Sequence, residues 1–409
     1  MKSGSPQQRI PSGVLAPRGF RGAAVSCGLK SKPGALDLAL LVSDGPAAAA
    51  GMFTRNRVAA APVQLSRRRL RRPWLRAIVI NAGNANACTG PDGLADAEAV
   101  ATEAASVLGV KPHEVAVAST GKIGERLPLS RVVAGIHAAG KKLATGPLTA
   151  GLLARAIMTT DTVPKSAAVS FTVAGREYRV GGMAKGAGMI APHLATMLAF
   201  LTTDATVSPR ALRTILRDVV EATFNRITVE GDTSTNDSVF LLANGAAGGP
   251  LIEPGGAGFD HLREAVMTVA DTLAEKLILD AEGATKFVEV RVTGAVSPQD
   301  AERAARAVAE SVLLKCALFG NDPNWGRIAC AVGYSGARFQ QENLAIDLAG
   351  VPVVRCGTPV RVEKNRLLRA VRSRRLNILV NLAAGSYEAR FRTCDLSHKY
   401  VEINALYHT

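Results

Sequence analysis

Several residue patterns that mark common protein classes are absent from this sequence. Aromatic residues make up only 4% of the 409 positions, and no apolar run is long enough to cross a membrane. The polar residues 1–13 lack the apolar core of a secretion signal. The six cysteines form no CxxC pair, and no two of the six histidines have the spacing of zinc ligands. We therefore expect a cytoplasmic protein with reduced thiols, no metal site and no membrane partner.

Signatures of nucleotide binding and of serine hydrolases are missing as well. The sequence contains no GxxxxGK[ST] phosphate loop, and no GxGxxG follows a strand and opens a helix. The segment Gly333-Tyr334-Ser335-Gly336 lacks the spacing of a nucleophile elbow. From these absences we expect no cofactor.

The net charge of +15 is concentrated in two arginine-rich clusters, at residues 67–76 and 361–375. Apolar residues such as Leu70 and Leu367 interrupt both clusters, as in surface segments with one packed side. Almost no aromatic residues are interleaved for stacking on bases. We interpret the clusters as solvated faces and expect no nucleic acid partner. A basic nucleic-acid-binding protein is the non-enzymatic alternative.

Strand and helix signals alternate along the chain and predict an α/β fold. The hydrophobic fraction of 47% is enough for a large core. An apolar strand at 77–81 precedes a helix at 95–108, with Asp92 placed to cap it and Gly109 to stop it. The other expected elements are a strand at 114–118, a helix at 131–143 capped by Ser130, a hairpin over 171–173 and 177–180, a helix at 261–277, and helices that begin at Ser208-Pro209 and Ser297-Pro298.

The most informative stretch is the glycine-rich segment 181–201, in which Thr196 stands alone between Ala195 and Met197 in an apolar run. Two interpretations fit these residues. Thr196 is either a core threonine of a strand, bonded to backbone, or a nucleophile. A buried threonine needs a base, and its own α-amino group serves as one if the chain is cut before it.

This segment resembles the ornithine acetyltransferase / glutamate N-acetyltransferase family of arginine biosynthesis, called ArgJ. The resemblance spans almost the whole chain, because many further segments match the family in the same order. The matching segments are 14–20, 59–63, 81–90, 119–124, 158–162, 185–200, 230–237, 282–286, 319–327, 394–396 and 400–409.

The resemblance implies a layered αββα sandwich of the type that self-cleaving aminopeptidases share. It also implies self-cleavage between Ala195 and Thr196, which gives an α chain of residues 1–195 and a β chain of residues 196–409. The two chains are expected to assemble as an α2β2 heterotetramer. Thr196 would take an acetyl group from N-acetylornithine and pass it to glutamate by double displacement.

Further roles transfer to matching positions. The Thr120 hydroxyl and the Gly121 backbone N–H would form an oxyanion hole, although these residues alone favour an ordinary turn. Lys185 suits a substrate carboxylate and Glu282 an ammonium group, although each is also compatible with a surface ion pair. The implied substrate-binding residues are Thr159, Lys185, Thr196, Glu282, Asn404 and Thr409.

Some features of the sequence leave the acetyl acceptor and the acetyl donor undecided. Arg392-Thr393 replaces the usual Trp-Gly pair, and Lys122 and Leu406 also depart from the family pattern. Some family members transfer only from N-acetylornithine, whereas others also use acetyl-CoA to make N-acetylglutamate, and no residue decides between them. The alternative function is an N-terminal threonine amidohydrolase or aminopeptidase of related fold, in which water replaces glutamate.

Overall fold

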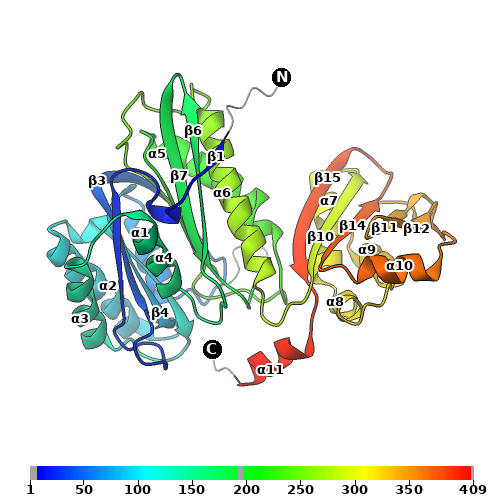
Figure 1. The fold of residues 1–409 in the computed structure, drawn as a ribbon, viewed down its shortest axis with the longest axis horizontal. Helices are drawn as coiled ribbons and strands as arrows, with labels where there is room; N and C mark the ends of the chain where they lie inside the picture. The colour runs from blue at the N-terminus through cyan, green and yellow to red at the C-terminus, as the bar shows by residue number, and fades with distance from the viewer. Residues whose placement is uncertain (1–6, 192–196, 407–409) are drawn as a thin grey trace.

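The structure is a computed structural model that describes residues 7–191 and 197–406. It has two lobes (Figure 1). The larger lobe ends with α6 (Phe259–Leu279), and the smaller lobe begins with β10 (Phe287–Ala295). Ala195, Thr196 and Thr409, three of the residues to which the sequence gives a role, lie outside the described residues.

Within the described residues, nine strands of the larger lobe form one sheet in the order β1-β6-β7-β8-β9-β3-β4-β5, with β2 also paired to β3. The long β3 joins two halves of this sheet, because its first part pairs with β2 and its last part with β9. The strands are β1 Gln8–Arg9, β2 Phe20–Val25, β3 Leu38–Phe53, β4 Trp74–Asn84, β5 Val115–Lys122, β6 Lys165–Val173, β7 Arg176–Lys185, β8 Leu198–Thr203 and β9 Ser238–Ala243.

The two halves of the sheet pack face to face. Alternate side chains of each strand point to opposite faces, so Leu41 of β3 and Phe200 of β8 enter one shared inner cluster. Their neighbours Leu40 and Leu201 point outward, under two separate groups of helices. The outer helices are α1 Ala61–Arg69, α2 Gly90–Leu108 and α3 Leu129–Gly140 on one side and α5 Pro209–Ala222 with α6 on the other; α4 Gly146–Ala156 packs into the inner cluster. The expected αββα layering is confirmed for this lobe.

The two helix starts predicted from a serine cap followed by proline are confirmed. Ser208 accepts the N–H of Ala211, and Ser297 accepts the N–H of Asp300. Gly109 ends α2 with a left-handed φ of 64°, as predicted.

Two predicted helix starts are wrong. α2 begins at Gly90, so Asp92 lies in its first turn, where a carboxylate favours the helix dipole, rather than at its cap. α3 begins at Leu129 after Pro128, so Ser130 is inside the helix. In both cases a proline lies near the helix start, and the helix begins before the polar residue that was expected to cap it.

The smaller lobe was not foreseen from the sequence as a separate unit. Its sheet has, within the described residues, the strand order β13-β12-β11-β14-β10-β15, and its own core joins these strands to α7 and α9. The strands are β10, β11 Ala345–Leu348, β12 Val351–Arg355, β13 Thr358–Pro359, β14 Arg375–Asn381 and β15 Tyr387–Cys394; the helices are α7 Pro298–Glu310, α8 Val312–Phe319, α9 Trp325–Tyr334, α10 Lys364–Val371 and α11 His398–Leu406.

After β15 the chain turns back, and α11 leads it toward the larger lobe (Figure 1). Among residues 7–191 and 197–406, no helix combines the length and the apolar composition that crossing a bilayer requires.

Along the chain, the predicted cleavage position comes between two strands of the larger lobe's sheet. β7 and β8, on either side of residues 192–196, are antiparallel partners, with Lys185 opposite Leu198. Chains cut at this position would therefore share one sheet and one core.

A substitution of Phe200 tests the packing of the inner layer of the sandwich. Its side chain is fully buried, and its ring stacks on Phe240 with centroids 5.7 Å apart. We expect Phe200→Ala to lower the free energy of unfolding by about 3–5 kcal/mol in urea titrations, because the cavity would lie between the two halves of the sheet. Leu148→Ala, at a position 85% exposed, is the control and should change little. Equal effects of the two substitutions would contradict the layering.

Candidate active site

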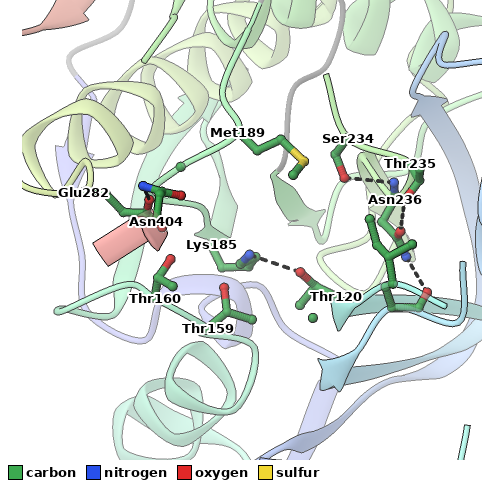
Figure 2. A pocket seen from close by; sticks show the side chains of 14 residues that line it. Thr120, Thr159, Thr160, Lys185, Met189, Ser234, Thr235, Asn236, Glu282 and Asn404 are labelled. Carbon is green, nitrogen blue, oxygen red and sulfur yellow. Dashed lines mark hydrogen bonds between the residues drawn. The ribbon is translucent and has the colours of Figure 1, made fainter. Parts of the chain in front are cut away.

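A pocket lies beside the ends of β5 and β7 in the larger lobe (Figure 2). The structure brings six of the predicted residues to it, although they are far apart in the sequence. These residues are Thr120, Gly121, Thr159, Lys185, Glu282 and Asn404. The pocket is also lined by residues to which the sequence gave no role, namely Ala85, Ile123, Thr160, Gly188, Met189, Ser234, Thr235 and Asn236.

Lys185, the last residue of β7, is almost fully buried at the pocket wall. Its Nζ donates a hydrogen bond of 3.1 Å to Thr120 Oγ1. An ammonium group has only donors, so the Thr120 oxygen must accept, and the hydroxyl proton is left available for another acceptor. Burial lowers the pKa of Lys185, while the nearby Asp161 carboxylate opposes that shift. Since Lys185 is buried, the alternative of a surface ion pair is wrong for it.

Thr120 and Gly121 belong to a strand and not to a turn. β5 continues to Lys122, and its pairing with β4 becomes irregular at Gly83 and Asn84. Gly121 has a φ of +132°, and a Cβ there would lie 2.3 Å from the Gly83 carbonyl carbon. Only glycine fits this close approach of two backbones. The interpretation of the pair as an ordinary turn is therefore wrong.

Glu282 and Asn404 form another wall of the pocket. Asn404 of α11 donates its side-chain N–H to Glu282 Oε2 at 2.9 Å, which brings the C-terminal helix to the site (Figure 2). Glu282 is also buried, and a Cβ on Gly188 would lie 2.4 Å from its Oε2. Glycine at position 188 therefore lets the carboxylate pack directly on the backbone, which is not the geometry of a surface ion pair.

Asn236 anchors the loop directly before β9, which lines the pocket opposite Lys185. Its Nδ2 donates to the carbonyl oxygens of Ala85 and Ser119, at 2.7 and 2.8 Å, and its Oδ1 accepts the Thr235 hydroxyl. The loop is thus joined to the ends of β4 and β5. Sequence reasoning assigned no role to this loop, although its run of short polar residues directly before a buried strand was a signal.

A buried ion network lies next to the pocket. Lys165 Nζ is 2.6 Å from Asp161 and 2.6 Å from Asp280, and the side chains of Lys165 and Asp161 are fully buried. Asp161 also accepts the backbone N–H groups of Thr159 and Gly186, at 3.0 and 2.7 Å. Burial raises the pKa of Asp161, but the nearby lysines and the Gly186 N–H outweigh it, so its pKa is held below the ordinary value. The network fixes the backbone on two sides of the pocket.

Lys165→Met tests this network. The substitution removes the cation that joins Asp161 to Asp280, and removing one partner of a buried ion pair costs about 3–5 kcal/mol. We expect the free energy of unfolding, measured in urea, to fall by this amount. The control Lys141→Met, at an exposed position, should change it little. An equally stable Lys165→Met variant would mean that the network does not hold the site together.

Glu230, a half-buried carboxyl group, faces the segment before residues 192–196. It accepts the N–H of Ile190, whose carbonyl oxygen in turn accepts the Val229 N–H at 2.7 Å. Burial raises the pKa of Glu230 to about 8, and its Oε2 has no hydrogen-bond partner among the described residues. The loop that begins at Glu230 therefore holds the glycine-rich segment.

Glu230→Gln tests the raised pKa. The raised pKa keeps the proton on folded Glu230 up to about pH 8, whereas the ordinary glutamate pKa, which applies to the unfolded chain, is 4.5. The folded state then binds more protons between these pH values, so wild-type stability falls as the pH rises through them. Glutamine keeps the oxygen for Ile190 and cannot ionise.

We therefore expect the stability of Glu230→Gln, measured by thermal unfolding across this range, to increase relative to wild type as the pH rises. A difference that stays constant with pH would contradict the raised pKa.

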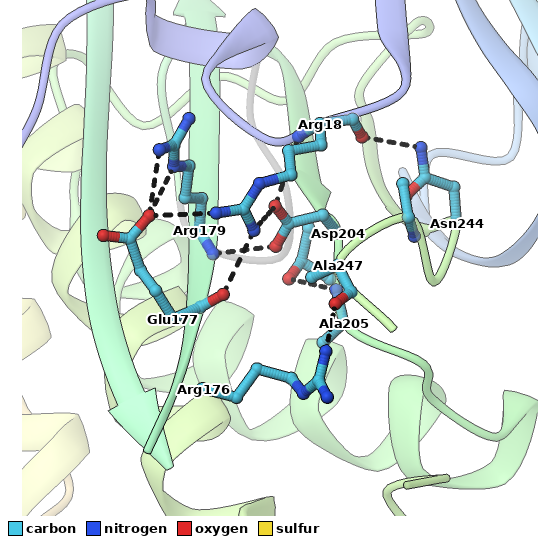
Figure 3. Close-up of polar contacts among 10 residues, drawn as sticks. Arg18, Arg176, Glu177, Arg179, Asp204, Ala205, Asn244 and Ala247 are labelled. Carbon is cyan, nitrogen blue, oxygen red and sulfur yellow. Dashed lines mark hydrogen bonds and ion pairs between the residues drawn. The ribbon is translucent and has the colours of Figure 1, made fainter. Parts of the chain in front are cut away.

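A third polar cluster, at the other end of β7, holds the chain before β2 (Figure 3). Arg18 contacts Asp204 at 3.1 Å and Glu177 at 3.2 Å, and Asn244 donates to the Arg18 carbonyl at 3.0 Å. The N–H of Arg179 completes the contacts of Asp204, at 2.8 Å. Its charges are paired with one another, so we interpret this cluster as an anchor of the fold.

Together these contacts define a polar pocket that contains groups of both charges. A buried cation, a carboxylate on another wall and a free hydroxyl proton converge in one pocket. Among the described residues, no three His, Cys, Asp or Glu side chains gather as a metal site would require.

Comparison with known proteins identifies the family. A sequence model of the ArgJ family matches residues 21–409. The chain is 48% identical over 401 residues to the arginine biosynthesis bifunctional protein ArgJ of Symbiobacterium thermophilum, which covers 98% of this chain and 99% of that protein. It is 47% identical over 393 residues to the protein of the same name from Geobacter sulfurreducens, with 96% and 99% covered. The chain belongs to the ArgJ family, and it is an N-acyltransferase of arginine biosynthesis.

One solved structure supports the fold. The crystal structure of arginine biosynthesis bifunctional protein ArgJ from Bacillus halodurans superposes with a TM-score of 0.50 at 38% identity. The match covers 98% of that chain but only 51% of this one.

Proposed function

We propose that this chain transfers the acetyl group of N-acetylornithine to glutamate through an acetyl ester on Thr196. The observation that carries the proposal is the contact between Lys185 Nζ and Thr120 Oγ1, with Glu282 on a neighbouring wall. A cation and a carboxylate in one pocket complement the carboxylate and ammonium groups of an amino acid. The name of the relatives supports the assignment to arginine biosynthesis.

The first step of the proposal is self-cleavage. The Thr196 hydroxyl attacks the carbonyl of Ala195, the acyl group shifts from nitrogen to oxygen, and water hydrolyses the ester. The products are the chains 1–195 and 196–409, and the new α-amino group has a reference pKa of about 7.7–8.0, which suits a general base.

The second step is transfer. The Thr196 oxygen attacks the acetyl carbonyl while its proton passes to the α-amino group, and ornithine leaves with a proton. The amine of glutamate then attacks the ester and releases N-acetylglutamate. We propose that the Thr120 hydroxyl and the Gly121 N–H bind the developing oxyanion, since Lys185 leaves the hydroxyl proton free to donate.

The remaining assignments concern binding. We propose that Lys185 binds a substrate carboxylate and Glu282 an ammonium group, with Thr159, Asn404 and Thr409 completing the site. Because the relatives are called bifunctional, we propose acetyl-CoA as a second acetyl donor at Thr196. We also propose that the products assemble as an α2β2 heterotetramer in the cytoplasm. The sheet that both products would share supports the pairing of one with the other.

Thr196→Ala is the direct test. We expect purified wild-type protein to give two fragments whose masses sum to 42.6 kDa plus one water, with the second fragment starting at Thr196. Thr196→Ala should remain one chain without transferase activity, because it lacks the nucleophile for both steps. Cleavage elsewhere, or cleavage in the variant, would overturn the proposal.

The transferase assay also distinguishes the proposed function from the amidohydrolase alternative. Ornithine release from N-acetylornithine should depend on added glutamate. Steady release in its absence would mean that water is the acceptor.

A further inference from the structure

A second cavity lies next to the active-site pocket. Thr160 lines the pocket and Thr162 lines the cavity, and residues so close in sequence have Cα atoms within about 8 Å of each other. The walls of the cavity come from both lobes, namely from the segment leading into β6, the end of α6 and the start of β14. Its volume of about 480 Å³ falls in the range of roughly 300–1,000 Å³ that is usual for small-molecule sites, whereas the active-site pocket has about 90 Å³.

An acidic residue, Asp280, lines this cavity, but its charge is already engaged. The carboxylate is 2.6 Å from Lys165 Nζ. It also accepts the backbone N–H groups of Thr162 and Val163, at 3.0 and 3.3 Å, and the Thr162 hydroxyl. A carboxylate that is paired with a cation and bonded to three further donors repels an incoming anion only weakly.

Two cations that line the cavity, Lys276 and Arg374, are in the opposite situation. The ion pairs that the described residues form at this cavity involve Lys165 and Arg375, and they leave Lys276 and Arg374 without a carboxylate. Lys276 is half-buried, and its Nζ donates to a neutral acceptor, the Ser166 carbonyl oxygen, at 2.5 Å. Burial lowers the pKa of Lys276, and the positive charge of Arg9 lowers it further. An anion in the cavity would relieve both effects.

Arg375 adds donors that are held in place. Its guanidinium group pairs with Glu275 at 2.7 Å and lies 4.9 Å from the centre of the Phe287 ring. A guanidinium has five N–H donors, so one carboxylate leaves some of them available. Arg374 and Arg375 end the second arginine-rich cluster, residues 361–375, to which the proposed function gives no role.

We propose that this cavity is a binding site for the phosphate groups of a nucleotide-sized ligand, held by Lys276, Arg374 and Arg375. Phosphate groups carry several negative charges and acceptor oxygens, and the planar forks of arginine match their geometry. Such groups belong either to the nucleotide end of acetyl-CoA, which is larger than the active-site pocket, or to a separate phosphorylated compound. The inference goes beyond the proposed function and stands without it, because binding requires no acetyl transfer.

The test is calorimetric titration of the full chain with coenzyme A, with ATP and with adenosine, which lacks phosphate. We expect the wild type to bind at least one of the two phosphorylated probes and not adenosine. Lys276→Gln and Arg374→Gln should each weaken that binding by about 10- to 100-fold, because each removes charge-assisted hydrogen bonds. Glutamine at position 276 keeps an N–H for the Ser166 carbonyl, and Arg374 is exposed, so both variants should fold.

Arg372→Gln is the matched control. Arg372 is exposed, lies two positions before Arg374 and does not line the cavity, yet its substitution removes the same charge. It should change the affinity little. Wild-type protein that binds neither phosphorylated probe would overturn the inference, and so would equal affinities of wild type, Arg374→Gln and Arg372→Gln.

Kinetics then distinguish the two sources of phosphate. If the cavity holds the nucleotide end of acetyl-CoA, Arg374→Gln should raise the KM for acetyl-CoA and leave the KM for N-acetylornithine unchanged. Weaker probe binding with both KM values unchanged would support a separate phosphorylated ligand. A wild-type protein that binds the probes but transfers no acetyl group would contradict the proposed function and leave this inference intact.

Discussion

Burying the ammonium group of Lys185 is the constraint on which the rest of the site depends. Moving a charge out of water is costly unless opposite charges and hydrogen-bonding groups replace the solvent. Asp161, Asp237 and Glu282 supply negative charge around it, and the Thr120 oxygen accepts its hydrogen bond. These groups come from segments before β6, before β9, after α6 and at the end of β5, so the site is complete only when the sheet has closed.

The sandwich explains how a chain could be cut in the middle of its own core and stay folded. β7 and β8 pair along six positions, and both send side chains into the inner and outer clusters of the lobe. Two fragments from a cut between these strands would remain joined by buried apolar surface, which is the dominant stabilising term in association. A single sheet could therefore keep two fragments together after a cut between β7 and β8.

Local signals and long-range contacts differ in how well the sequence predicts them. Ser208 and Ser297 cap helices as predicted because their partners are three residues away. The strand predicted at 114–118 was found, but its extension to Lys122 was missed because the irregular register there depends on β4. The Lys165–Asp280 pair was missed because 115 positions separate the two residues. The pocket residues were selected by family resemblance; composition and spacing alone left Thr120 and Glu282 undecided.

The central claim is that Thr196 carries the acetyl group between two substrates. The most direct test is to mix cleaved enzyme with N-acetylornithine in the absence of glutamate and to measure the intact mass of both fragments. The account predicts that the fragment beginning at Thr196 gains the mass of one acetyl group and loses it when glutamate is added. Transfer to glutamate with no acetylated fragment under any quench condition would contradict the covalent mechanism.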